Sequence, residues 1–215
     1  MLNKKLRRAA ALSLVALLAG CATPGPDPDV KLAEVMKASF RDQGIAKVDR
    51  LQQDEADAAC SKAMGKPLPE AQARTLQDAA LKTVKMPTDG RFIGDWREGE
   101  KLAQNGRGMT WSDASASTSA NGGSCYNCHQ LSTAEISFGT IGPSLYGYGR
   151  NRGVADPAAE AAKPIVEYTW VKLNNAKAYN ACSDMPRFGH AGLLDETQLK
   201  NLMALLLDPQ SPVNR

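Results

Sequence analysis

The sequence has few aromatic residues, few histidines and no long apolar run, and each shortage narrows what the chain can be. Phe, Trp and Tyr make up 6% of the 215 residues, and His occurs twice. The longest apolar stretch, residues 9–19, is too short to cross a bilayer as a stable helix. No segment alternates apolar and polar residues as a half-buried strand does. We therefore expect an all-α fold without a membrane-spanning helix.

Acidic residues are absent from the first twenty positions, and this skews the overall charge. Four of the 26 basic residues lie there, so the rest of the chain carries 22 basic and 23 acidic residues. The net charge of +3 thus becomes −1 without this leader. No basic stripe with interleaved aromatics occurs elsewhere, so a nucleic-acid partner is not expected.

Residues 1–20 are typical of an export signal peptide, with four cations before the apolar run. The end of this leader, Leu18-Ala19-Gly20-Cys21, is similar to the lipobox of bacterial lipoproteins, in which the cysteine is lipidated and becomes the mature N-terminus. Cys21 is therefore the predicted lipidation site. Ala22 follows it instead of Asp, which favours the outer over the inner membrane. We expect a periplasmic protein that meets the membrane only through its lipid anchor; an ordinary signal peptide cleaved nearby is the alternative.

The composition of the mature chain changes twice. Residues 21–30 are rich in Pro and Gly and predict a short stiff tether. Residues 31–90 predict a helical N-terminal extension with thin apolar faces, which would pack on the rest of the chain or on a partner. Residues 91–215 form the second predicted domain. Apolar spacing and turn residues predict six helical segments, near residues 31–44, 48–65, 69–84, 95–105, 164–173 and 195–207.

Residues 125–129 read Cys-Tyr-Asn-Cys-His, the C-x-x-C-H signature of covalent haem c attachment. Two thiols one turn apart can each add to a haem vinyl group, and the adjacent imidazole can bind the iron. A redox dithiol does not need the following His, and a zinc site would need a second tight pair of ligands. We therefore expect one covalently bound haem c, held by Cys125, Cys128 and His129. The export signal agrees with this, because bacteria attach haem c outside the cytoplasm.

The segment Gly142-Pro143-Ser144-Leu145 is similar to the G-P-x-L element of small class I cytochromes c. This resemblance implies that residues 91–215 have a class I cytochrome c-like fold. It also implies that the Pro143 carbonyl accepts the N–H of the proximal imidazole and orients it. In that family a distal Met lies just before the terminal helix, as Met185 does, so Met185 is the expected sixth ligand. His190 is the rival, and thioether ligation would raise the reduction potential.

Two cysteines remain once Cys21, Cys125 and Cys128 are assigned. An oxidising compartment and an even remainder suggest that Cys60 and Cys182 form a disulfide. Two free thiols are the alternative.

Taken together, residues 90–215 closely resemble SoxX, the monohaem subunit of the SoxAX cytochrome of bacterial sulfur oxidation. Residues 50–60 also look like the longer members of that family. The haem motif alone indicates only a cytochrome c. Two further runs make the resemblance specific to SoxX: Gly-Thr-Ile-Gly-Pro-Ser-Leu-Tyr-Gly-Tyr-Gly and the C-terminal Ser-Pro-Val-Asn. The matching segments are residues 95–101, 125–130, 139–149, 180–189 and 208–214.

The resemblance implies an electron-transfer subunit of an L-cysteine S-thiosulfotransferase. Its partner would be a SoxA-like dihaem or monohaem subunit, which joins thiosulfate oxidatively to a cysteine of the carrier protein SoxYZ. The catalytic cysteine-ligated haem would belong to that partner, so no catalytic residue is assigned in this chain, and a downstream cytochrome c would accept the electrons. Two alternatives stay open: a stand-alone lipid-anchored electron carrier, and an enzyme that acts at its own haem through an open sixth position.

Overall fold

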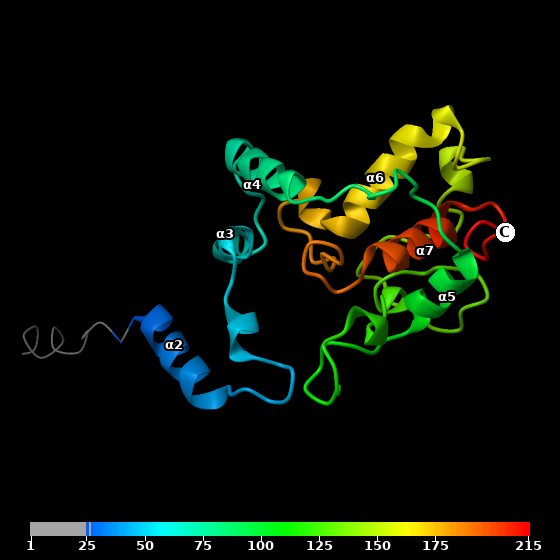
Figure 1. The fold of residues 1–215 in the computed structure, drawn as a ribbon. Helices are drawn as coiled ribbons and strands as arrows, with labels where there is room; N and C mark the ends of the chain where they lie inside the picture. Colours follow the sequence, from blue (N-terminus) through cyan, green and yellow to red (C-terminus); the bar gives the residue numbers. More distant parts are fainter. Residues whose placement is uncertain (1–24, 26) are drawn as a thin grey trace, which may run out of the picture. The chain divides into compact units, whose positions relative to one another are not determined.

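The computed structural model describes residue 25 and residues 27–215 (Figure 1). The signal peptide predicted for residues 1–20 and the lipidation site Cys21 lie outside the described residues. The chain divides into two compact units between Arg41 and Asp42. Each unit is described by itself.

Regular structure in the described residues is helical, and no strand occurs among them, which confirms the predicted all-α class. The α-helices are α2 (Pro28–Ser39), α3 (Glu55–Ala63), α4 (Glu70–Lys82), α5 (Trp96–Gln104), α6 (Lys163–Asn174) and α7 (Glu196–Leu207). Short 3-10 turns lie between them: η1 (Val48–Leu51), η2 (Thr118–Ala120), η3 (Cys125–Asn127), η4 (Arg150–Arg152), η5 (Glu160–Ala162) and η6 (Ala176–Ala178).

In the first unit the described structure is mainly α2. The helix begins at Pro28, because proline fits the first turn of a helix and the Asp27 carboxylate accepts the N–H of Asp29 at 2.9 Å. The last three residues of the expected tether, 28–30, are therefore helical. No residue of α2 is buried.

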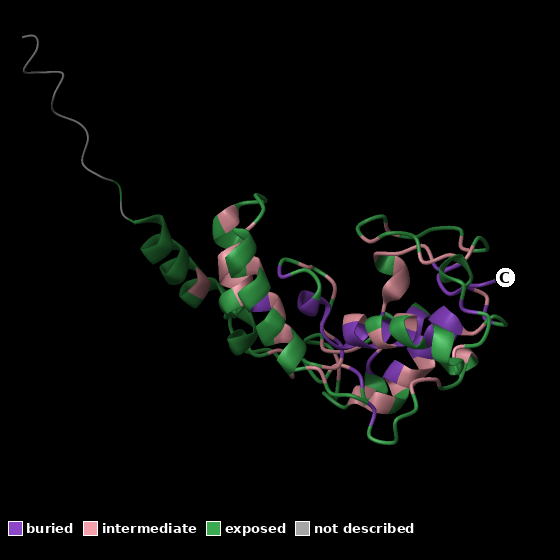
Figure 2. Cartoon of the chain, turned by 90° about the horizontal axis from the view of Figure 1, so that it is seen from above, coloured by how far each residue is buried: buried purple, intermediate pink, exposed green. Residues whose placement is uncertain are grey.

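The core of the second unit is built from α5, α6 and α7, which lie together in Figure 1. Figure 2 shows the buried residues concentrated in this part of the chain. Trp170 of α6 is 1% exposed and Met203 of α7 is fully buried. Helix α5 approaches α7 so closely at Gly99 that an added Cβ would lie 2.1 Å from the Asn201 carbonyl oxygen. The glycine thus sets the separation of these two helices.

The prediction of one helix over residues 48–65 is wrong, because the segment is divided. It forms η1, then an extended stretch, and then α3. The break comes at Asp54, whose backbone is extended and whose carboxylate accepts the N–H of Asp57 at 2.8 Å, as an N-cap does.

The segment that follows belongs to the same compact unit as the core, although the sequence placed a boundary near residue 90. Helix α4 buries one residue, Leu76, so its apolar face is thin as expected. Polar contacts of the residues just after its C-terminal end attach it instead. The Trp170 indole N–H donates to the Lys85 carbonyl at 2.8 Å, and the Asn175 amide donates to the Thr83 hydroxyl at 3.0 Å.

Candidate haem-attachment site

The five residues of the C-x-x-C-H motif form one tight turn. The Cys125 carbonyl accepts the N–H of Cys128 at 3.1 Å and that of His129 at 2.9 Å. Both thiols are half-buried, and neither is part of a disulfide. Burial raises the pKa of the Cys125 thiol to about 12, so the thiolate, which is the reactive form, is scarcer than in an exposed cysteine.

The end of α5 supports the turn from its N-terminal side. The N–H of Gly123 donates to the Leu102 carbonyl at 2.8 Å, and the N–H of Ser124 donates to the Asn105 carbonyl at 3.1 Å. A Cβ at Gly122 would lie 1.8 Å from the Asn105 oxygen, so only glycine permits this approach. The motif is therefore fixed to a helix that is itself packed on the core.

A second segment, residues 139–145, supports the turn from its other side. Three backbone hydrogen bonds of 2.8 Å join the two segments, from Gly139 to Tyr126, from Gly142 to Cys128 and from Leu145 to Gln130. This pairing brings Pro143 next to the imidazole of His129.

The His129 ring is held in one orientation. Its Nδ1 lies 2.6 Å from the Pro143 carbonyl oxygen. Because a carbonyl can only accept, Nδ1 must carry the proton, and the lone pair of Nε2 remains available for a metal. Gly142 fits against the ring, and an added Cβ would lie 2.1 Å from Cε1. The structure thus brings together Cys125, Cys128, His129 and Pro143.

Met185 lies in the irregular segment between η6 and α7. It is half-buried, packs against the hydrophobic core, and its N–H donates to the Ser183 hydroxyl at 3.3 Å. Its role as sixth ligand stays a prediction. The rival, His190, is exposed, and its backbone N–H donates to the Asn174 carbonyl at 3.0 Å.

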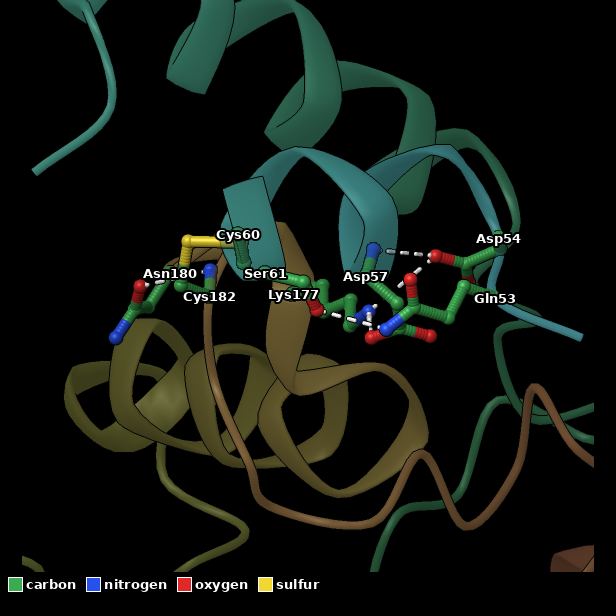
Figure 3. The surroundings of a disulfide bond; sticks show 8 residues. All are labelled: Gln53, Asp54, Asp57, Cys60, Ser61, Lys177, Asn180 and Cys182. Atoms are coloured by element: carbon green, nitrogen blue, oxygen red, sulfur yellow. Dashed lines mark hydrogen bonds and ion pairs between the residues drawn. A yellow bond between two sulfur atoms is a disulfide. The ribbon is translucent and has the colours of Figure 1, made fainter. Parts of the chain in front are cut away.

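Cys60 of α3 and Cys182 are joined by a disulfide with an S–S distance of 2.01 Å (Figure 3). The bond connects α3 to the segment that carries Met185. The structure therefore has the bridge that the sequence suggested and not the two free thiols.

An ion-pair cluster beside this disulfide was missed in the sequence. We call it the α3 cluster, and it consists of Asp54, Asp57, Lys177 and Arg187 (the first three are labelled in Figure 3). Partial burial by itself raises the pKa of Asp54, but the Asp57 N–H and the Arg187 guanidinium outweigh it and hold that pKa well below its usual value. No local sequence signal reveals pairs more than 100 residues apart.

The residues at the motif fit a haem. Two unbridged thiols flank one turn, and an oriented imidazole has a free nitrogen. In the described part of the chain no group of three or more His, Cys, Asp or Glu side chains could hold a metal ion. A haem iron takes four ligands from its porphyrin, so it needs only two from the chain, here one imidazole and one thioether. A haem site therefore does not require three or more clustered side chains.

The chain is similar to a known lipoprotein over part of its length. No protein-family profile matches the chain. The chain is 39% identical over 137 residues to a protein of Aquifex aeolicus (strain VF5) that carries the name "Uncharacterized lipoprotein". The match covers 62% of this chain and 59% of that protein, so the chain spans less than two thirds of the relative's length. Similarity to a lipoprotein agrees with the predicted lipobox.

The membrane prediction can also be compared with the structure. Among the described residues, no helix has the length and apolar character needed to cross a membrane.

Proposed function

We propose that this chain is a periplasmic, lipid-anchored cytochrome with one covalently bound haem c, and that it transfers electrons as a SoxX-like subunit. The observation that carries the proposal is the 2.6 Å hydrogen bond between His129 Nδ1 and the Pro143 carbonyl within a C-x-x-C-H turn. A redox dithiol gives no reason for an adjacent imidazole to be held in this way. A zinc site would need further ligands, which Cys60 and Cys182 do not offer because they are joined in a disulfide.

The side chains of the turn have separate tasks. Cys125 and Cys128 would each hold the haem through a thioether: the C–S bond would form as the thiol hydrogen went to the neighbouring vinyl carbon, with no electron gained or lost. His129 would bind the iron through Nε2, because Nδ1–H donates to Pro143, which fixes the ring and makes the free nitrogen a stronger ligand. Outside the turn, Met185 would supply the sixth ligand.

The haem, when bound, supplies reversible one-electron exchange between Fe(III) and Fe(II). The segment between His129 and Pro143 exposes three large apolar residues, Ile136, Phe138 and Ile141. Exposed apolar residues favour contact with another apolar group. These three therefore support the proposal that a haem or a partner surface lies beside the motif.

The partners follow from the resemblance to SoxX. The proposed complex joins this chain to a SoxA-like subunit, which forms the bond between thiosulfate and a SoxYZ cysteine. This chain then accepts the electrons and passes them to a downstream cytochrome c. It is thus the electron-transfer subunit of an L-cysteine S-thiosulfotransferase. The lipobox and the similarity to a lipoprotein support the anchor.

Covalent haem attachment is tested by expression of the full chain with its export signal in a host that matures c-type cytochromes. The denatured polypeptide should keep haem on a gel, whereas Cys125→Ala with Cys128→Ala should lose it. The matched control removes the other cysteine pair, Cys60→Ala with Cys182→Ala, and should keep haem. A wild-type chain that migrates without pigment refutes the proposal.

The partner is tested by affinity purification from thiosulfate-grown cells. A haem-bearing SoxA-like subunit should co-purify, and the pair should attach thiosulfate to SoxYZ. Purification as a haem protein without companions would instead support the stand-alone carrier. A five-coordinate, high-spin iron would support an enzyme that acts at its own haem.

A further inference from the structure

The segment that carries Met185 has little regular structure, yet it is fixed on both sides. Three residues before Met185, Cys182 is bonded to Cys60 of α3. Two residues after it, Arg187 forms ion pairs with Asp54, the N-cap of α3, at 2.5 Å and with Asp57 of the first turn at 3.9 Å. Both attachments thus go to the same short helix.

The ionic attachment is balanced in charge and partly shielded from water. Lys177 of η6 is 6% exposed at its side chain and contacts both Asp54, at 3.4 Å, and Asp57. Two cations therefore face two carboxylates. Removing one partner of a buried cation strongly destabilises a fold, because the cation is left without a compensating charge. The cluster therefore holds α3, η6 and Arg187 together.

These two attachments restrict where Met185 can lie. An extended chain advances at most about 3.3–3.6 Å per residue, so the Cα of Met185 stays within roughly 11 Å of Cys182 and roughly 7 Å of Arg187. A ligand confined in this way loses little further freedom when it binds a metal.

We propose that α3 positions the distal ligand: Cys182 and Arg187 act as positioning residues that hold the Met185 thioether ready for the haem iron. This inference rests on the proposed function, because it assumes the haem and Met185 ligation. It adds that the helix before the cytochrome-like domain, and not the domain alone, determines how firmly the sixth ligand is held.

The test uses the haem-loaded full chain and measures how readily added imidazole displaces the distal ligand. Arg187→Gln and Asp54→Asn should each raise the association constant of imidazole about tenfold or more. Each variant loses a hydrogen bond to a charged group, so the distal ligand is held less firmly and is displaced more readily. Asparagine is itself a good N-cap, so Asp54→Asn keeps the start of α3. Arg187→Lys should recover part of the wild-type resistance, because it keeps the cation.

The matched control breaks an ion pair that is not attached to the Met185 segment. Lys200 of α7 contacts Asp89 at 2.7 Å, and Asp89 is about as exposed as Asp54. Asp89→Asn should leave imidazole binding within about twofold of wild type, since the loss of a partly exposed pair elsewhere changes only overall stability. Thermal unfolding of every variant, followed by circular dichroism, checks that the helices are intact.

The outcomes separate this inference from the proposed function. A wild-type chain without bound haem refutes the function. A haem-loaded chain without the thioether-to-iron charge-transfer band, or one in which Met185→Ala leaves the spectrum unchanged, overturns Met185 ligation and with it this inference, while covalent haem attachment stands. Imidazole binding that is equal in wild type, Arg187→Gln and Asp54→Asn also overturns it, because the cluster would then serve stability only.

Discussion

The contact between Gly142 and His129 allows a direct test of the geometry at the C-x-x-C-H turn. In Gly142→Ala, the added Cβ would meet Cε1 of the ring at 2.1 Å and Nδ1 at 2.5 Å, whereas ordinary contact begins at 3.4 Å. The backbone at this position is fixed, because its N–H donates to the Cys128 carbonyl at 2.8 Å. The imidazole therefore has to move away from the Pro143 carbonyl.

The cost has two parts. Loss of the hydrogen bond between His129 and Pro143 should lower the free energy of unfolding by about 1 kcal/mol. The forced shift of a packed ring adds about 1–3 kcal/mol. We expect a total loss of about 2–4 kcal/mol in urea-induced unfolding. Haem bound per polypeptide should fall as well, because the ring no longer presents Nε2 in the right direction.

Gly106→Ala is the matched control for this prediction. Its Cβ would lie 3.5 Å from the Ser124 hydroxyl and 3.8 Å from the Tyr126 hydroxyl, which are ordinary contacts next to the same turn. The control should keep its haem and change the free energy of unfolding by less than about 1 kcal/mol. If Gly142→Ala matched the control in stability, haem content and spectrum, the described contact between Gly142 and the ring would be refuted.

Three further predictions concern the second unit. The pKa of Asp54 lies well below its usual value of 3.8 in the folded chain, so its stabilising effect is complete above that pH and is lost as the pH falls from there through the folded pKa. The difference in melting temperature between wild type and Asp54→Asn should stay constant from about pH 7 to about pH 5 and shrink as the pH falls from about 4 to about 2, and a difference that does not change below about pH 4 would contradict this. The buried Asn214 amide accepts the N–H groups of Gly149 and Arg150 and donates to the carbonyls of Leu206 and Asp208; Asn214→Ala should cost about 2–4 kcal/mol in urea unfolding, and a loss below about 1 kcal/mol would count against it. Gly99→Ala would place a Cβ 2.1 Å from the Asn201 oxygen and should cost about 1–3 kcal/mol or more; a thermal melt equal to that of Gly106→Ala would show that α5 does not approach α7 so closely.

Helix positions in the core were predictable because local signals mark their ends. Asp95 and Asp195 are N-caps in the structure, and the second forms a capping box with Gln198. Pro164 lies in the first turn of α6. The contact between His129 and Pro143 was predictable only through the resemblance of residues 142–145 to the G-P-x-L element, and in the structure short backbone pairing brings the two residues together.

What the sequence could not reveal depends on segments far apart in the chain. The break between η1 and α3 arises because Asp54 is extended and caps α3, although the spacing of apolar residues continues across it. Lys177 and Asp57 are 120 residues apart, and neither shows by its neighbours that it will be paired. The close approach at Gly99 likewise depends on α7 and not on residues next to it.

The way α3 is attached explains why this part of the chain carries a disulfide at all. The helix has no buried residue, so apolar packing contributes little to its position. The bond between Cys60 and Cys182 closes a separation of 122 residues and could stabilise the fold by about 5 kcal/mol in the chain-entropy model. The ion pairs of the α3 cluster then orient the helix, because Asp54 and Asp57 lie at its N-terminal end and pair with Lys177 and Arg187. A covalent bond thus supplies the attachment that the thin apolar face cannot, and it does so beside Met185, where a loosely held helix would leave the proposed distal ligand free to move.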